Sequence, residues 1–167
     1  MVATGSMDNI SRLYDVETGH CLHTLVGHTG EVVSLDFNST GKLLATGSFD
    51  HTVKIWDTNY GSIVHTLKGH RGEISNVKFK FLVGFISLGQ KLELLLITIN
   101  LKILMHSFFL AFCILISLFA VQSNLCLSAS IDQSCKNWDA KDGNCLHTLG
   151  GYEDEILDVT FNISKVE

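Results

Sequence analysis

One sequence pattern occurs three times in this chain of 167 residues. Each copy opens with a short run that ends in Asp, continues to an aromatic residue followed by Asp, and passes a glycine-containing turn to reach a His-Thr-Leu triplet. The opening runs are Ala3–Asp8, Ala45–Asp50 and Leu127–Asp132, and the triplets begin at His23, His65 and His147. The step from Asp8 to Asp50 is 42 residues. A period of about 40–45 residues is typical of repeats that each fold into one four-stranded unit.

Further landmarks close each copy in the same register. They are Gly27-His28, Gly69-His70 and, in altered form, Gly151-Tyr152. After each pair a Glu opens an apolar run, and these runs end at Phe37, Phe79 and Phe161. Apolar and polar residues alternate along the runs, and the chain contains no proline. Alternation of this kind between turn residues predicts short antiparallel strands.

With Gly-His near one end and Trp56-Asp57 or Trp138-Asp139 near the other, the repeat resembles the WD-repeat family. The resemblance covers everything except one insertion. It implies an all-β fold, an incomplete WD-repeat β-propeller of about three blades of four antiparallel strands. We expect the first blade to lack its innermost strand and the last position to be reduced to a single strand. Three blades are too few to close a ring, so we expect the chain to be unstable or to need partner chains.

The resemblance also implies a buried hydrogen-bond chain in each complete blade. Carried over residue by residue, the structural set is His28, Ser48, Asp50 and Trp56 in one blade and His70, Ser130, Asp132 and Trp138 in the next. Asp accepts from His, His bridges to the hydroxyl, and the hydroxyl meets the indole N–H, which can only donate. The first blade has Tyr14 where Trp is expected, and its Gly-His histidine would lie before Met1, so we expect that it does not form this network.

The repeat argues against two chemical roles for these polar residues. A Ser-His-Asp set could be a hydrolase triad, but such a site normally occurs once and needs an exposed nucleophile, whereas these residues recur as architecture does. The histidines of the triplets lie one repeat apart, too far to share a metal ion at bonds of about 2 Å. We therefore expect no catalytic residues, no metal site and no cofactor. Glu153, Asp154 and Glu155 are solvated loop residues or part of a partner-binding rim.

An insertion interrupts the third copy. The step from Asp50 to Asp132 is 82 residues rather than 42, and alignment places the excess at residues 82–121, in the turn between the first and second strands of a blade. Residues 103–121 carry no formal charge, which by length makes them a candidate membrane span or an apolar helix. A single crossing, however, would separate two strands that must pair in one sheet, so we expect no membrane association. A lid loop is a second reading, but functional loops are generally polar.

A third interpretation of the insertion, that it is translated intron, is favoured. Its Phe, Leu, Ile, Ser and Cys residues, ending in Ala120-Val121-Gln122, are what a pyrimidine-rich intron end would encode. The predicted organisation is therefore WD-repeat blades at 1–81, translated intron at 82–121, and blade continuation at 122–167. Transcript sequencing tests this, because abundant messages that retain these codons would contradict it.

Net charge and cysteine content limit the classes of partner and the cellular compartment that we expect. The net charge of −5 and the absence of a basic run argue against nucleic acid. An odd number of cysteines, five, without a C-x-x-C pair indicates reduced thiols in a cytoplasmic protein, and the first residues do not resemble a secretory signal. A non-enzymatic scaffold that binds other proteins is the expected function.

The resemblance implies a finer assignment. The runs Thr46–Asp57 and Asp154–Asp158 resemble the WD-repeat proteins that help assemble outer dynein arms in cilia and flagella. Dynein arm subunits and the ciliary transport machinery would then be the partners, and the cytoplasm, axoneme or basal body the location. The alternative is a substrate receptor of a ubiquitin ligase or another signalling scaffold.

Overall fold

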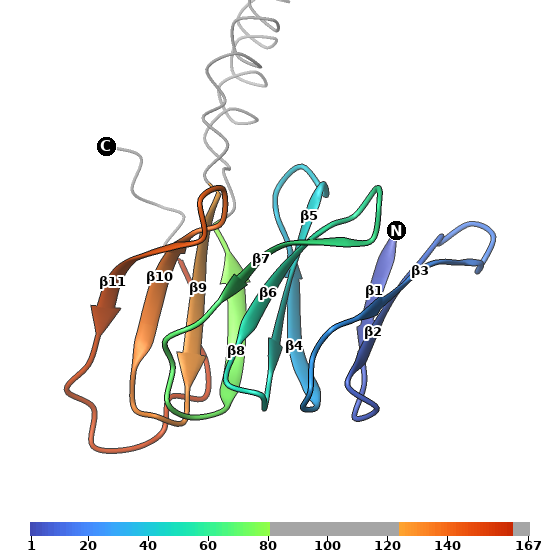
Figure 1. Cartoon of the computed structure of the whole chain (residues 1–167). Helices are drawn as coiled ribbons and strands as arrows, with labels where there is room; N and C mark the ends of the chain where they lie inside the picture. The colour runs from blue at the N-terminus through green and yellow to red at the C-terminus, as the bar shows by residue number, and fades with distance from the viewer. Residues whose placement is uncertain (81–123, 162–167) are drawn as a thin grey trace, which may run out of the picture. The chain divides into compact units, whose positions relative to one another are not determined.

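The computed structural model describes residues 1–80 and 124–161, and all regular structure in them is β-strand. The strands are β1 (Val2–Gly5), β2 (Ile10–Tyr14), β3 (Cys21–Val26), β4 (Val32–Phe37), β5 (Leu43–Ser48), β6 (Val53–Asp57), β7 (Ser62–Leu67), β8 (Ile74–Phe79), β9 (Leu125–Ser130), β10 (Cys135–Asp139) and β11 (Asn144–Leu149). Figure 1 shows them as three sheets that follow one another along the chain.

Each sheet is one blade of the predicted propeller. The first has the order β1-β2-β3, the second β4-β5-β6-β7 and the third β8-β9-β10-β11, and all neighbours are antiparallel. The expectation of an incomplete WD-repeat propeller, with a first blade that lacks its innermost strand, is confirmed.

Repeated turn chemistry ends the strands at matching places. In the turns after β1, β5 and β9 the carboxylate of Asp8, Asp50 or Asp132 accepts a hydrogen bond from the backbone N–H two residues later. The residue after each Asp has a positive φ of 63–67°, which is tolerated there because the Asp side chain stabilises the turn. Positive φ in the next turn of each blade falls on glycine, which adopts it without steric penalty.

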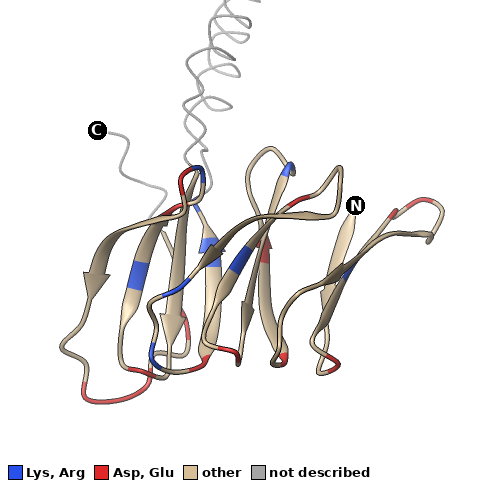
Figure 2. Cartoon of the chain, in the orientation of Figure 1, with Lys and Arg blue, Asp and Glu red and all other residues tan. Residues whose placement is uncertain are grey.

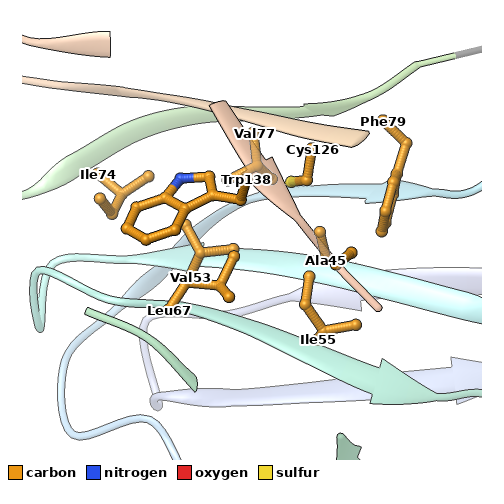
Figure 3. Packing of buried hydrophobic residues seen from close by; sticks show 10 residues of the cluster. Ala45, Val53, Ile55, Leu67, Ile74, Val77, Phe79, Cys126 and Trp138 are labelled. Carbon is orange, nitrogen blue, oxygen red and sulfur yellow. The ribbon is translucent and has the colours of Figure 1, made fainter. Parts of the chain in front are cut away.

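Apolar side chains are buried between neighbouring blades. Residues of β5, β6 and β7 pack against residues of β8, β9 and β10, and Trp138 lies over Leu67 and Val53 (Figure 3). A second cluster joins the first two blades, where Trp56 and Leu44 pack against Leu13 and Leu25. Each blade therefore obtains its core from its neighbour, as expected for a repeat that cannot bury both faces alone.

The ends of β8 and β9 are adjacent although 45 residues separate Phe79 and Leu125 in sequence. Phe79 pairs with Cys126, and the Lys80 N–H donates to Leu125 O at 2.9 Å. The residues assigned to translated intron, 82–121, lie outside the described residues, so that hypothesis stays a prediction. Within the described ranges no helix is long and apolar enough to cross a membrane.

The prediction of a single strand at the C-terminal end is wrong. Residues 155–161 follow the apolar pattern of β4 and β8 but form no strand. A strand needs a hydrogen-bonded neighbour, and the blade to which this segment would be innermost is absent from the described part of the chain. The segment instead lies against β8, where the Asn76 side chain donates to Asp158.

Candidate functional site

A buried hydrogen-bond chain joins four side chains in the second blade. The Trp56 indole N–H donates to the Thr46 hydroxyl at 2.8 Å, and the same hydroxyl lies 2.8 Å from His28 Nε2. On its other side, His28 Nδ1 lies 2.7 Å from an Asp50 carboxylate oxygen. His28 belongs to the connection between β3 and β4, whereas Asp50 begins the turn after β5. The chain of bonds therefore fixes this connection against the turn and strands that follow it.

The donor and acceptor chemistry assigns the protons. An ionised carboxylate can only accept, so His28 Nδ1 carries the proton that it shares with Asp50. Nε2 is then an acceptor and receives the Thr46 O–H, while the Thr46 oxygen accepts from the indole. Every member of the chain is satisfied with a neutral imidazole, which is favourable because unpaired buried polar groups destabilise a fold.

The surroundings shift both titrating groups in the direction this assignment requires. Burial of His28 lowers the pKa of its ring and outweighs the opposing effect of Asp50. Burial alone would raise the pKa of Asp50, but hydrogen bonds from Thr52, His28 and the backbone N–H of Thr29 outweigh it and lower that pKa to about 2. A neutral histidine beside an ionised aspartate is therefore the stable state near neutral pH.

The third blade repeats the arrangement with its own residues. Trp138 donates to Ser128 at 2.8 Å, Ser128 Oγ lies 2.8 Å from His70 Nε2, and His70 Nδ1 lies 3.0 Å from Asp132. Burial lowers the pKa of His70. Hydrogen bonds from Ser134 and the backbone N–H of Arg71 overcome the effect of burial and hold the pKa of Asp132 well below its usual range.

Two residues of the predicted networks are corrected by this geometry. The structure brings His28, Asp50 and Trp56 together, and likewise His70, Asp132 and Trp138. The hydroxyls that join them are those of Thr46 and Ser128, not Ser48 and Ser130. Ser48 donates to Gly30 O at 2.9 Å and Ser130 to Glu73 O at 2.7 Å, and each accepts the backbone N–H of the following turn Asp.

Strand register explains the correction. Trp56 lies directly opposite Leu44 in the β5–β6 pair, so Thr46 is its diagonal neighbour on the same face. Diagonal neighbours are within reach of a large aromatic side chain, whereas Ser48 lies two residues further along the strand. The aligned column Thr4, Thr46 and Ser128 is as regular as the column Ser6, Ser48 and Ser130. The sequence therefore contained the signal for Thr46 and Ser128, but two aligned columns of hydroxyl residues were equally regular. Only the pairing of β5 with β6 distinguishes them.

The same contacts bear on the hydrolase alternative. Ser48 and His28 bind different partners, and the side chains of His28 and Asp50 are only 1% and 9% exposed. The histidines of the triplets also have separate tasks, because His23 Nε2 lies 3.0 Å from Asn59 O and His65 Nε2 lies 2.7 Å from Lys141 O, each in the next blade. Within residues 1–80 and 124–161 no group of three His, Cys, Asp or Glu side chains is placed to hold a metal ion.

One end of the blades combines exposed apolar and acidic side chains. We define the turn face as the turns after β1, β5 and β9 together with the connections that lead into β4 and β8 and residues 152–155. Met7 and Phe49 are exposed in equivalent positions of two of these turns. Acidic residues gather at the same end, along the lower edge in Figure 2, and include Glu31, Glu73 and the run Glu153–Glu155.

These observations define the class of the fold. Four-stranded antiparallel sheets, a 42-residue period and a repeated Trp-hydroxyl-His-Asp network characterise an incomplete WD-repeat propeller. Residues 19–57 match the family model described as "WD domain, G-beta repeat". This segment, from the end of the first blade to the end of β6, is therefore a WD repeat.

The chain is similar to individual relatives over short stretches only. The chain is 50% identical over 42 residues to F-box-like/WD repeat-containing protein TBL1X of Mus musculus. This alignment covers 25% of this chain and 8% of that protein. It is 53% identical over 45 residues to Periodic tryptophan protein 2 homolog of Schizosaccharomyces pombe, covering 26% of this chain and 5% of the relative. The alignments thus span less than a tenth of these relatives' own length.

Proposed function

We propose that this chain acts as a non-enzymatic scaffold that binds other proteins through its turn face. WD repeats generally serve as protein-interaction scaffolds, and the reactive residue types of the repeat are used internally. The observation that carries the proposal is the exposed apolar pair Met7 and Phe49 at equivalent positions of an end that carries more acidic than basic side chains. Repeated exposed apolar side chains with charged neighbours are typical of a protein-binding surface.

The chemistry of the turn face indicates the kind of partner. Glu31, Glu73 and the Glu153–Glu155 run outnumber the basic Arg71 and Lys68 at this end. A partner segment with basic side chains around an apolar anchor complements such a surface, since opposite potentials favour encounter and fix register. We expect the apolar anchor to contact Phe49.

A more specific role is proposed from two runs of sequence. Thr46–Asp57 and Asp154–Asp158 resemble WD-repeat proteins that help assemble outer dynein arms, which favours dynein arm subunits and ciliary transport machinery as partners. The location proposed with it is the cytoplasm together with the axoneme or basal body. The names of the relatives above contain no reference to dynein, so this finer proposal depends on the two runs alone.

The alternative is a substrate receptor of a ubiquitin ligase or another signalling scaffold. Two relatives favour it, because their names contain the term F-box-like. They are TBL1X of mouse and TBL1Y of Homo sapiens, and the latter is 50% identical to this chain over 42 residues. Both candidates use the same turn face and differ in what it binds.

Affinity capture from ciliated cells separates these candidates. The full chain, a Phe49→Ser variant and a Tyr60→Ser control are used as baits. Tyr60 is an equally suitable exposed aromatic residue, but it lies in the turn after β6, at the opposite end of the blade. Loss of partners in Phe49→Ser but not in Tyr60→Ser supports binding by the turn face, whereas equal recovery with all three baits contradicts it. Dynein arm subunits in the eluate support the specific role, and ligase components support the alternative.

A further inference from the structure

A lysine stands two residues before the tryptophan of each buried network. Lys54 precedes Trp56 on β6, and Lys136 precedes Trp138 on β10. Lysine is rarely buried unless its charge is paired, yet Lys54 is only 8% exposed and Lys136 is partly buried. Neither lysine has a carboxylate partner within residues 1–80 and 124–161. Contacts other than an ion pair therefore hold these side chains in place.

Polar contacts connect each lysine to the strands beside it. Lys54 lies directly opposite Thr46 on β5 and Thr66 on β7. Its Nζ donates to Thr66 Oγ1 at 3.1 Å, and the Thr46 hydroxyl lies 3.5 Å from its backbone oxygen. Lys136 repeats the first contact, because its Nζ donates to Thr148 Oγ1 at 2.9 Å. Since Thr46 supplies the hydroxyl of the network, Lys54 lies next to that network.

The stem of each lysine packs on the glycine of a Gly-His pair. A Cβ added to Gly27 would lie 3.7 Å from Lys54 Cε and 3.3 Å from Trp56 Cη2. The third blade has the same arrangement, with 3.8 Å between the Cβ position of Gly69 and the Cε of its lysine. The residue after each glycine is the network histidine. The apolar part of the lysine is thus buried against the connection that carries the histidine, and its charged end reaches the outer strand.

Two charged side chains of opposite sign act on the ring of His28. Burial lowers the pKa of the ring most strongly, Asp50 from the turn after β5 raises it, and Lys54 from β6 lowers it. The other hydrogen-bond partner of the ring is the hydroxyl of Thr46, which carries no charge. A positive charge nearby disfavours a second positive charge on the imidazole. The lysine therefore opposes the aspartate and acts in the same direction as burial.

The second network has the same balance of charges. Burial lowers the pKa of His70, Asp132 raises it, and Lys136 lowers it. The Ser134 hydroxyl lies 3.2 Å from Nδ1 of this ring and carries no charge. In the described part of the chain, each histidine that bonds a network aspartate thus has a lysine of the following tryptophan strand beside it.

We propose that Lys54 and Lys136 are positioning residues, each of which keeps the histidine of its own network neutral. A charged imidazole carries a proton on both nitrogens, so its Nε2 could no longer accept the hydroxyl proton of Thr46 or Ser128. The carboxylate beside each ring favours that charged form, and the lysine charge opposes it. The lysine thereby preserves the direction of every hydrogen bond in the network.

NMR titration of the histidine rings in the full chain tests this role. Lys54→Met keeps an unbranched stem against Gly27 and removes the charge. The pKa of His28 should rise in this variant, while the pKa of His70 stays at its wild-type value. Lys136→Met should have the reverse effect and raise the pKa of His70 alone. An unchanged pKa of the adjacent histidine in both variants, or equal shifts of both histidines in either one, would overturn the proposal.

The variant Lys54→Arg separates the effect of charge from that of packing. Arginine keeps the positive charge but has a larger, planar head. The pKa of His28 should therefore stay close to its wild-type value in Lys54→Arg, in contrast to Lys54→Met. An equal rise in both variants would show that packing, and not charge, controls the ring, and it would contradict the proposal.

The indole proton resonances of Trp56 and Trp138 verify in each variant that the networks are still folded. Should Lys54→Met fail to fold, Lys136→Met applies the same test to the third blade, where the lysine is less buried. The titration requires no partner, so its outcome is independent of the scaffold function proposed above.

Discussion

At the scale of single residues, the decisive atom is the hydroxyl oxygen of Thr46. It accepts from the Trp56 indole at 2.8 Å and lies 2.8 Å from His28 Nε2, so it connects the apolar core to the titrating pair. Ser48 has a hydroxyl on the same strand but bonds Gly30 O. The two hydroxyls therefore differ in what their loss would expose.

Replacement of Thr46 by Val keeps the side-chain shape and removes the shared hydroxyl. The Trp56 N–H and His28 Nε2 lose their partners, and each orphaned group costs about 1–3 kcal/mol. We expect a marked shift of the Trp56 indole proton resonance in NMR spectra and lower stability in urea. In Ser48→Ala the indole resonance should stay in place, even though that variant also loses a hydrogen bond. A moved indole resonance in Ser48→Ala with none in Thr46→Val would reverse the assignment.

The titrating pairs predict how stability depends on pH. In the folded chain the pKa of His28 and of His70 lies below the ordinary value of 6.5, so the unfolded chain binds more protons as pH falls below about 6.5. The free energy of unfolding therefore decreases on acidification in that range. Asp50, whose pKa falls from 3.8 to about 2, adds a second loss between those values. Urea denaturation at stepped pH checks this, and stability that increased from pH 7 to 5 would contradict it.

At the scale of elements, each blade is completed by packing on its neighbour. Leu67 ends β7 and is 2% exposed beneath Trp138 of the third blade, whereas Val64 on the same strand is 41% exposed. Two side chains of one strand thus differ in role, because Leu67 packs between two blades and Val64 contacts solvent.

Truncation of these two residues measures the contribution of the blade contact. Leu67→Ala should lower the free energy of unfolding by about 2–5 kcal/mol, because it removes buried methyl groups and leaves a cavity. Val64→Ala serves as the control on the same strand and should change stability by about 0.5 kcal/mol or less. Denaturant titration compares the two, and similar losses would show that the blades do not depend on this contact.

The loop between β8 and β9 provides a second element-scale prediction. Removal of residues 82–121 leaves five residues between the strands, Lys80, Phe81 and 122–124, which equals the length of the loop 38–42 between β4 and β5. Both ends already make matching bonds, since Lys80 N donates to Leu125 O as Asn38 N donates to Leu43 O. We expect the deletion variant to keep its β circular dichroism spectrum and to aggregate less. Loss of the β signal would show that residues 82–121 are needed for folding.

At the scale of the whole molecule, equivalent positions of the described blades differ in burial. Leu67 is 2% exposed, whereas the equivalent Leu149 of the third blade is 50% exposed. The variant Leu149→Asp should therefore lower the free energy of unfolding much less than Leu67→Asp, because only the latter takes a charge out of water. Urea denaturation compares the two variants, and equal losses of stability would contradict this difference.

The sequence by itself determined the repeat unit with its strands and turns, because a 42-residue period and Gly, Asp and Trp landmarks are local signals. The resemblance to WD repeats then indicated His28, Asp50 and Trp56 as network residues. Only the tertiary structure decided between the hydroxyls of Thr46 and Ser48, because both columns recur and the choice depends on which residue lies diagonal to Trp56 across the β5–β6 pair. The same holds for Leu25, Leu67 and Leu149, which are identical in the repeat but buried or exposed according to whether another blade follows. The burial of a side chain depends on the blade that packs against it, and the sequence of a single repeat contains no information about that blade.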